Sequence, residues 1–392
     1  MNRATIIFTV LLFSACAVYA RQKDKTKKDI YVEIPYEVVA GIPVIDVQIK
    51  GKTYKFVLDT GASGVHVTRK VVDQSLLRLK RKTKGVGDTN GVRKQQQQAV
   101  INDIRIGELL FSTSGAYVSE NDSYIFSCYG FDGIIGGDFL KQFAVKFDSR
   151  AKIVILATDV SRLVPSQQRW SKMFLVSSKT FFRIETEGYS SKNILFDSGS
   201  NSPSLGVDTV KYRMYKELGV WEVTNEETGY GATSVGLHGE MVNEKKYRAV
   251  ASEFSFGGYT FYNVPVTTTR VPKAGFVLTS FGDIILDYPG KRYCFIPHQA
   301  EVDWKNTRYK VGFSVKDSGL IVAMVWGEEM ATKIAVGDKV VKVGSQQLNS
   351  VDRCFRTSMS SLIGQYTTPE NNTILLEKPD GTQYTLSVDV FL

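Results

Sequence analysis

A short pattern occurs twice in this 392-residue chain and limits what the chain can fold into. Residues 56–61 read Phe-Val-Leu-Asp-Thr-Gly, and residues 194–199 read Ile-Leu-Phe-Asp-Ser-Gly. Each apolar run is typical of a buried strand, and an Asp and a Gly soon after it are typical of a tight turn. The pattern therefore predicts two carboxylates, those of Asp59 and Asp197, each at the end of a core strand.

The sequence around the two acids repeats in the same order. Before each acid, apolar and polar residues alternate as in a half-buried strand and then reach a glycine turn. After each acid come a short predicted helix, a glycine-rich hairpin and a strand that closes on a glycine. The matching segments are residues 45–50 and 182–187, 71–79 and 210–218, 85–91 and 229–239, 104–107 and 254–257, and 145–148 and 284–287. This repetition predicts two duplicated all-β units, at residues 31–157 and 173–298, each of ordinary domain size.

The two units resemble the aspartic proteases, particularly retropepsin-like proteases of bacterial type and their two-lobed pepsin-like relatives. Residues 59–63, Asp-Thr-Gly-Ala-Ser, match the Asp-Thr-Gly motif of that family, and residues 133–136, Gly-Ile-Ile-Gly, are similar to its second signature. The resemblance covers roughly residues 31–298. It implies a mainly β fold with two duplicated β-barrel lobes, each supplying one acid.

The resemblance also implies a role for each residue of the repeated motif. Asp59 and Asp197 would form one catalytic dyad that shares a proton, because two carboxylates at close range cannot both ionise. Their neighbours would support the two loops, through hydrogen bonds across the junction and close approach of the glycines: Thr60, Gly61, Ser198 and Gly199. The glycine-rich hairpins would be flaps over an extended substrate, through Gly85, Gly87, Gly229, Tyr230 and Gly231.

One departure from the family pattern leaves alternatives open. Where the first unit has Ile-Ile-Gly at 134–136, the second has Val-Leu-Thr at 277–279, which would put Thr279 in the place of the motif glycine. A degenerate second lobe would make the chain a catalytically dead protein that holds peptides in its cleft. A third possibility is a protease whose active form pairs the first lobes of two chains.

The last part of the chain, residues 308–392, resembles a PDZ domain of bacterial protease type. Its most specific mark is the Gly-Asp-x-Val-x-x-Val run at 337–343, and a helix is predicted over 352–363. The resemblance implies that Val311, Gly312 and Phe313 bind the C-termini of peptides and tether protein substrates near the cleft. The alternative is a PDZ-like domain that only packs against the protease. If the chain is catalytically dead, its cleft and this domain would together hold peptides.

The first twenty residues have the order of an export signal. A basic start, an apolar stretch too short to span a bilayer and small residues near position 20 predict removal of residues 1–20. Phe-Ser-Ala-Cys at 13–16 also resembles a lipoprotein box, so Cys16 is a possible lipid anchor. We therefore expect an exported protein, located in the periplasm or held at the outer membrane as a lipoprotein.

Composition narrows the remaining function classes. The net charge of +9 comes largely from residues 21–28 and 78–84, which carry no interleaved aromatics. Solvated surface charge therefore explains it better than a nucleic-acid partner. The cysteines form no Cys-x-x-Cys pair and the three histidines lack metal spacing, so no metal or other cofactor is expected. The sequence predicts an exported aspartic endopeptidase that acts on proteins or peptides.

Overall fold

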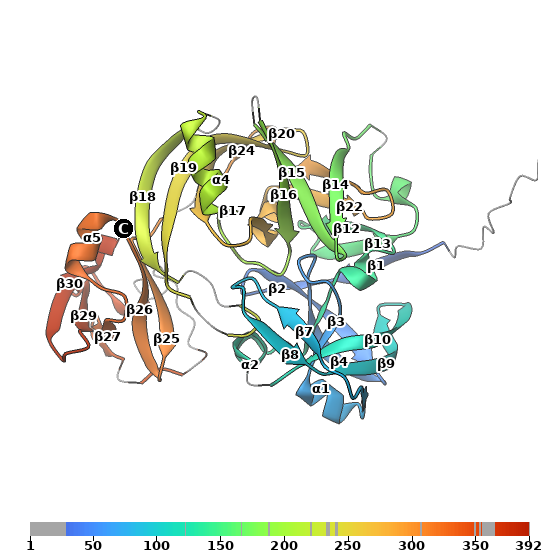
Figure 1. Ribbon diagram of the computed structural model, residues 1–392, viewed down its shortest axis with the longest axis horizontal. Coiled ribbons are helices and arrows are strands. Elements are labelled where there is room, and N and C mark those ends of the chain that lie inside the picture. Colours follow the sequence, from blue (N-terminus) through green and yellow to red (C-terminus); the bar gives the residue numbers. More distant parts are fainter. Residues whose placement is uncertain are drawn as a thin grey trace, which may run out of the picture.

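The computed structural model describes residues 29–391 apart from 122, 166, 187–188, 220–221, 233–235, 240–241, 306–307, 349, 353 and 355–364. The chain is mainly β (Figure 1). A first lobe (residues 31–157, blue to cyan-green) lies below a second lobe (residues 171–298, green to yellow-orange), and a C-terminal unit (residues 308–391, orange to red) lies beside both. The predicted leader at 1–20, including Cys16, and most of the helix predicted over 352–363 lie outside the described residues.

Six strands of the first lobe close into a ring in the order β3-β4-β11-β5-β10-β9, because β9 pairs back with β3. Their bounds are β3 Ile42–Ile49, β4 Lys52–Leu58, β11 Gly133–Ile135, β5 His66–Thr68, β10 Leu109–Ser119 and β9 Gln98–Ile106. The predicted alternation is present in β3, where Ile45, Val47 and Ile49 are buried and the residues between them are exposed. The inward row fills the barrel, as a half-buried strand requires.

Shorter elements complete the first lobe. They are β2 Glu37–Val39, α1 Arg69–Gln74, β6 Arg78–Leu79, the hairpin of β7 Lys84–Gly87 and β8 Arg93–Gln96, α2 Tyr124–Tyr129 and α3 Gly137–Leu140. The side chain of Thr68 caps α1 by accepting a hydrogen bond from the backbone N–H of Val71.

The second lobe closes in the same way, in the order β15-β16-β21-β17-β20-β19. The bounds are β15 Lys179–Thr186, β16 Tyr189–Asp197, β21 Lys273–Gly275, β17 Leu205–Val207, β20 Tyr259–Thr268 and β19 Glu244–Phe256. Strand β16 pairs in parallel with β21, just as β4 pairs in parallel with β11. The helix that follows β17, α4 Thr209–Glu217, corresponds to α1, and β18 Val223–Gly231 leads into β19.

A shared sheet joins the two lobes. It is built from β1 Tyr31–Pro35, β12 Ala144–Asp148, β13 Ile153–Ala157, β14 Ser171–Val176, β22 Gly282–Asp287 and β23 Arg292–Pro297. Strands β12 and β22, which contain the matching segments 145–148 and 284–287, pair with each other antiparallel. The short helices η1 Val160–Arg162 and η2 Phe276–Ser280 precede β14 and β22 respectively. The lobes are therefore continuous through backbone hydrogen bonds as well as packed side chains.

The C-terminal unit has an apolar core of its own, which includes Leu320, Val322, Val340, Ile374 and Leu376. After β24 Val302–Asp303 it consists of β25 Val311–Lys316, β26 Gly319–Trp326, α5 Glu328–Lys333, β27 Lys339–Val343, β28 Gln346–Gln347, β29 Thr373–Glu377, β30 Gln383–Ser387 and η3 Val388–Phe391. Within the described residues no helix is long and apolar enough to cross a bilayer.

The second glycine-rich hairpin differs from its expected role as a flap. Gly229, Tyr230 and Gly231 pair antiparallel with Trp326, Val325 and Met324 of β26, so β18 joins the second lobe to the C-terminal unit. A β-carbon on Gly231 would lie 2.1 Å from the carbonyl oxygen of Ala323, and its φ is +136°. These glycines therefore allow close pairing of two strands rather than movement over a cleft.

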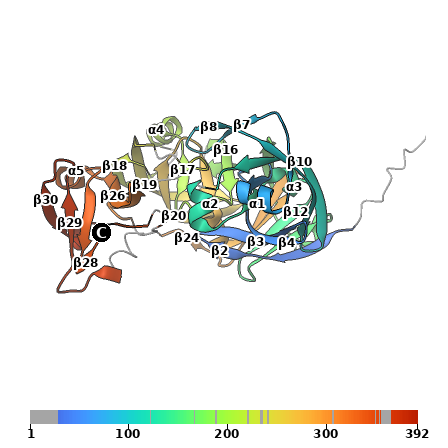
Figure 2. The same cartoon turned by 90° about the horizontal axis from the view of Figure 1, so that it is seen from below.

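A disulfide between Cys128 and Cys354 ties the C-terminal unit to the first lobe, with 4.7 Å between the Cα atoms. Cys128 lies in α2, and Figure 2 shows α2 between the C-terminal unit and the rest of the first lobe. Three scattered cysteines predicted no such pairing, because the partners are 226 residues apart. The third, Cys294, is free and buried.

Candidate active site

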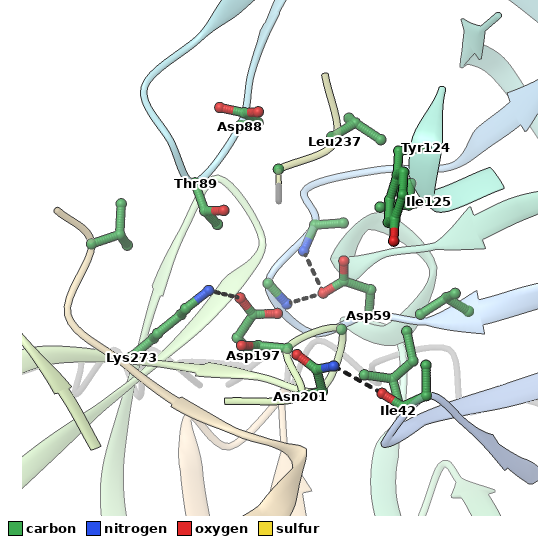
Figure 3. Close-up of a pocket in the computed structure, with 18 of the residues that line it drawn as sticks. Ile42, Asp59, Asp88, Thr89, Tyr124, Ile125, Asp197, Asn201, Leu237 and Lys273 are labelled. Atoms are coloured by element: carbon green, nitrogen blue, oxygen red, sulfur yellow. Dashed lines mark hydrogen bonds and ion pairs between the residues drawn. The ribbon is translucent and has the colours of Figure 1, made fainter. Parts of the chain in front are cut away.

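The two predicted acids meet where the lobes join. Asp59 follows β4, and its backbone N–H donates to the carbonyl of Ile135 in the paired strand (2.9 Å). Asp197 ends β16 in the equivalent place. Their carboxyl groups are close enough for each to influence the ionisation of the other, and Figure 3 shows them side by side on facing loops. The structure thus brings together two side chains that are 138 positions apart in sequence.

Hydrogen bonds cross between the two loops in a reciprocal pattern. The backbone N–H of Thr60 donates to Ser198 Oγ (2.9 Å), and that of Ser198 donates to Thr60 Oγ1 (3.1 Å). Each hydroxyl then donates to the opposite strand, Thr60 Oγ1 to the carbonyl of Phe196 (2.6 Å) and Ser198 Oγ to that of Leu58 (2.7 Å). Both side chains are fully buried, so the pattern holds the two acids in register.

The glycines of the motif let the loops approach closely. A β-carbon on Gly61 would lie 2.6 Å from Asp197 Oδ1, and one on Gly199 would lie 2.5 Å from Asp59 Cγ. Each acid therefore occupies the space that a side chain on the opposite loop would need. Any larger residue at either position would force the carboxyl groups apart.

Burial of Asp59, and then the charge of Asp197 beside it, raise the pKa of Asp59 to about 7. Backbone N–H groups of Gly61 and Ala62 donate to Asp59 Oδ1 at 2.7 and 3.0 Å and oppose that rise. Like charges at this range resist ionising together. Asp59 therefore keeps its proton up to about pH 7, which suits general acid and base work.

The motif glycine of the second lobe is Gly275, not the position of Thr279. Gly275 pairs with Asp197, and a β-carbon there would lie 2.6 Å from the carbonyl oxygen of Ser200. In the first lobe, a β-carbon on Gly136 would meet the carbonyl of Ala62 in the same way, at 2.8 Å. Thr279 lies in η2, where its Oγ1 donates to the carbonyl of Phe276. The second lobe therefore keeps the motif glycine, four residues before Thr279.

A cavity of about 920 Å³ opens above the acids. The first glycine-rich hairpin borders it, including the predicted Gly85 and Gly87, whereas Gly229, Tyr230 and Gly231 do not. The second lobe contributes instead Ala232, Gly236 and Leu237, which follow β18 (Figure 3 labels Leu237). Two contacts join these segments, from the backbone N–H of His238 to Asp88 Oδ2 (3.3 Å) and between His238 Nε2 and the carbonyl of Val86 (2.9 Å).

The C-terminal unit forms part of the same cavity wall. All three residues predicted to bind peptide termini, Val311, Gly312 and Phe313, line it together with Met324 and Trp326. Sequence reasoning had treated them as a separate site. Aromatic residues on and near α2 of the first lobe line the cavity too: Tyr124, Tyr129 and Phe131.

Sequence reasoning missed a lysine beside the acids. Lys273 Nζ lies 3.7 Å from Asp197 Oδ2, and both side chains are nearly buried (Figure 3). The only sequence feature that could have indicated Lys273 is its position directly before Ala-Gly at 274–275. Among the described residues, no group of three or more His, Cys, Asp or Glu side chains could hold a metal ion.

Residues 45–142, about a quarter of the chain, match a family model described as "gag-polyprotein putative aspartyl protease". The match supports an aspartic protease. The aspartyl-protease match includes Asp59 and ends within the first lobe, before Asp197. No curated protein matches the chain.

Proposed function

We propose that this chain is an exported aspartic endopeptidase in which Asp59 and Asp197 activate water against a peptide bond. The observation that carries the proposal is the pair of adjacent carboxyls of Asp59 and Asp197, which faces a cavity large enough for several residues of a peptide. The aspartyl-protease match at residues 45–142 supports a hydrolase of this class.

In the proposed reaction one carboxyl is ionised and the other protonated. The ionised carboxylate takes a proton from a water molecule while the water oxygen attacks the carbonyl carbon. The protonated carboxyl donates its proton to the carbonyl oxygen at the same time. The tetrahedral diol then collapses. The first carboxyl gives its proton to the leaving nitrogen, the second recovers one from a diol hydroxyl, and the C–N bond breaks.

A dyad formed within one chain is favoured over a dimer of first lobes. The ring order of strands is the same in both lobes, which supports a duplication, and the loop contacts between Thr60 and Ser198 already satisfy both loops. A second chain would have to displace the whole second lobe to supply another Asp59.

The C-terminal unit would act as a PDZ-like module that holds protein substrates. Its strand β25 lines the cavity, so a peptide bound there would lie close to the acids. Export to an oxidising compartment is supported by the disulfide between Cys128 and Cys354, since such bonds are rare in reducing cytoplasm.

The test is to digest a peptide library with the wild type, Asp59→Asn and Asp197→Asn. We expect the wild type to cleave, and each variant to lose at least about 100-fold in kcat/KM while keeping its circular dichroism spectrum. Cleavage by Asp197→Asn at the wild-type rate would overturn the one-chain dyad. Binding of peptides without cleavage by the wild type would favour the catalytically dead alternative.

A further inference from the structure

The two acids have different surroundings because one strand position differs between the lobes. Ile134 pairs with Val57, which lies two residues before Asp59. Lys273 pairs with Leu195, which lies two residues before Asp197. Ile134 and Lys273 are therefore structural counterparts. In the first lobe this position packs into an apolar cluster, and in the second it carries a cation to the acid.

The ammonium group of Lys273 lies close to the Asp197 carboxylate in a site with little solvent. Its Nζ is 3.7 Å from Asp197 Oδ2, and the two side chains are 13% and 7% exposed. The distance is longer than a hydrogen bond, so the interaction is between charges. With little water between or around them, the charges are screened far less than in a surface ion pair.

The groups that face Asp197 come from both lobes. Asp59 lies on the opposite loop and Lys273 on the neighbouring strand β21. The other titratable side chains that line the cavity are His66, Asp88, Tyr117, Tyr124, Tyr129 and Lys179. Burial lowers the pKa of His66 to about 4, so its ring is neutral near pH 7. Among the described residues, only Lys273 forms an ion pair with either acid.

We propose that Lys273 is a positioning residue that keeps Asp197 ionised, so that Asp197 is the base and Asp59 carries the shared proton. This inference rests on the proposed peptidase function. In the reaction, Asp197 would take the proton from water, and Asp59 would protonate the carbonyl oxygen. Two carboxyls in equal surroundings would leave that choice open, and Lys273 breaks the symmetry.

The experiment compares pH profiles of kcat/KM for the wild type, Lys273→Met, Lys273→Arg and Lys179→Met. The acidic limb reports ionisation of the base in the free enzyme. An opposite charge at this range typically lowers a carboxyl pKa by about 1 unit or more. Lys273→Met should therefore move the acidic limb to higher pH by about 1 unit. Lys273→Arg should keep the limb near its wild-type position. Lys179→Met removes the same charge from the same cavity and should also leave the limb in place.

A second measurement does not need turnover. The thermal midpoint of Lys273→Met should fall below that of the wild type at about pH 6. The difference should shrink at strongly acidic pH, where protonated carboxyls no longer attract the cation. If the wild type cleaves peptides and the acidic limb of Lys273→Met does not move, the role of Lys273 is wrong but the peptidase function stands. An equal shift in Lys273→Arg would lead to the same conclusion. If Lys273→Met is less stable than the wild type as expected, but the wild type cleaves nothing, the result would instead contradict the peptidase function and the catalytic roles built on it.

Discussion

At the scale of single residues, the proposed chemistry depends on two acids that lie on similar loops and differ in their neighbours. Asp59 receives two backbone N–H groups, from Gly61 and Ala62, whereas Asp197 has the cation of Lys273. The glycines at 61 and 199 leave room for each opposite carboxyl. Small differences around identical groups can thus give them distinct roles in one reaction.

The raised pKa of Asp59 has a predicted consequence for activity and stability. Since that pKa is about 7 in the folded chain, kcat/KM should fall as the pH rises through about 7, when the pair loses its proton. The unfolded carboxyl ionises near pH 4, so the folded state binds more protons between about pH 4 and 7, and wild-type stability should fall across that window.

Asp59→Asn removes that titration and provides the control. Its free energy of unfolding, measured in urea against pH, should lack the wild-type decline, which we expect to be on the order of 3 kcal/mol from about pH 4 to about pH 7. Parallel curves for the two proteins would mean that Asp59 titrates normally, and the shared-proton arrangement would be wrong.

At the scale of elements, the contact between β18 and the C-terminal unit is organised by one carboxylate. Glu227 in β18 accepts hydrogen bonds from Arg248 in β19 (2.7 Å) and from Arg308 (3.2 Å), and also pairs with Lys310. Arg248 also donates to the carbonyl of Tyr309 (2.7 Å), and its guanidinium lies 4.5 Å from the centre of a Trp326 ring. Strand pairing and charge thus act at the same junction.

Glu227→Gln should weaken this junction. Burial raises the pKa of Glu227, but hydrogen bonds from Lys310 and Arg248 outweigh that effect and the pKa lies below its ordinary value. Its contribution is therefore present near neutral pH and is lost as the pH falls through the folded pKa. We expect a loss of about 2 kcal/mol at neutral pH by urea unfolding, less than for a fully buried pair because Glu227 keeps some solvent contact.

The matched control for this change is Glu329→Gln. Glu329 pairs with Lys333 one helical turn away in α5, and its side chain is 85% exposed. No measurable change in stability is expected there. If both variants lost equal stability, the junction would have no special role.

At the scale of the whole molecule, the C-terminal unit is joined to the second lobe by strand pairing and to the first lobe by a disulfide. Strand β26 extends the sheet of the second lobe, and the disulfide from Cys354 reaches the first lobe at Cys128. Between these attachments, residues of β25 and β26 line the cavity that contains the acids. The unit therefore belongs to the wall of the candidate active site rather than to a separate arm.

Cys354→Ser should lower the free energy of unfolding by about 3 kcal/mol and reduce kcat/KM on short peptides as well as long ones, because one wall of the cavity loses its covalent tie. Reductant should lower the thermal midpoint of the wild type and leave that of Cys354→Ser unchanged. Cys294→Ser, which removes the buried free thiol, should keep the response to reductant. A wild-type midpoint that stays constant after thiol labelling shows the bond reduced would contradict this role.

The sequence by itself determined the elements that short-range patterns encode. The run of three apolar residues before Asp59 and before Asp197 specified a buried strand, and the hydroxyl and glycine after each acid specified the loop that carries it. Repetition of these patterns predicted two lobes with the same order of strands. Such features depend on neighbours within a few residues, so they can be read without knowledge of the fold.

Only the tertiary structure decided which distant residues meet. The register of the parallel pair β16–β21 places Gly275, rather than Thr279, beside Asp197. The same register brings Lys273 close to the Asp197 carboxylate. Pairing of β18 with β26 changed the expected role of Gly229, and packing of the C-terminal unit brought Cys354 to Cys128. A shift of a few residues in strand register changes which side chains face a site, but leaves local composition and periodicity almost unaltered. These contacts therefore follow from packing across the whole chain, which no single stretch of sequence encodes.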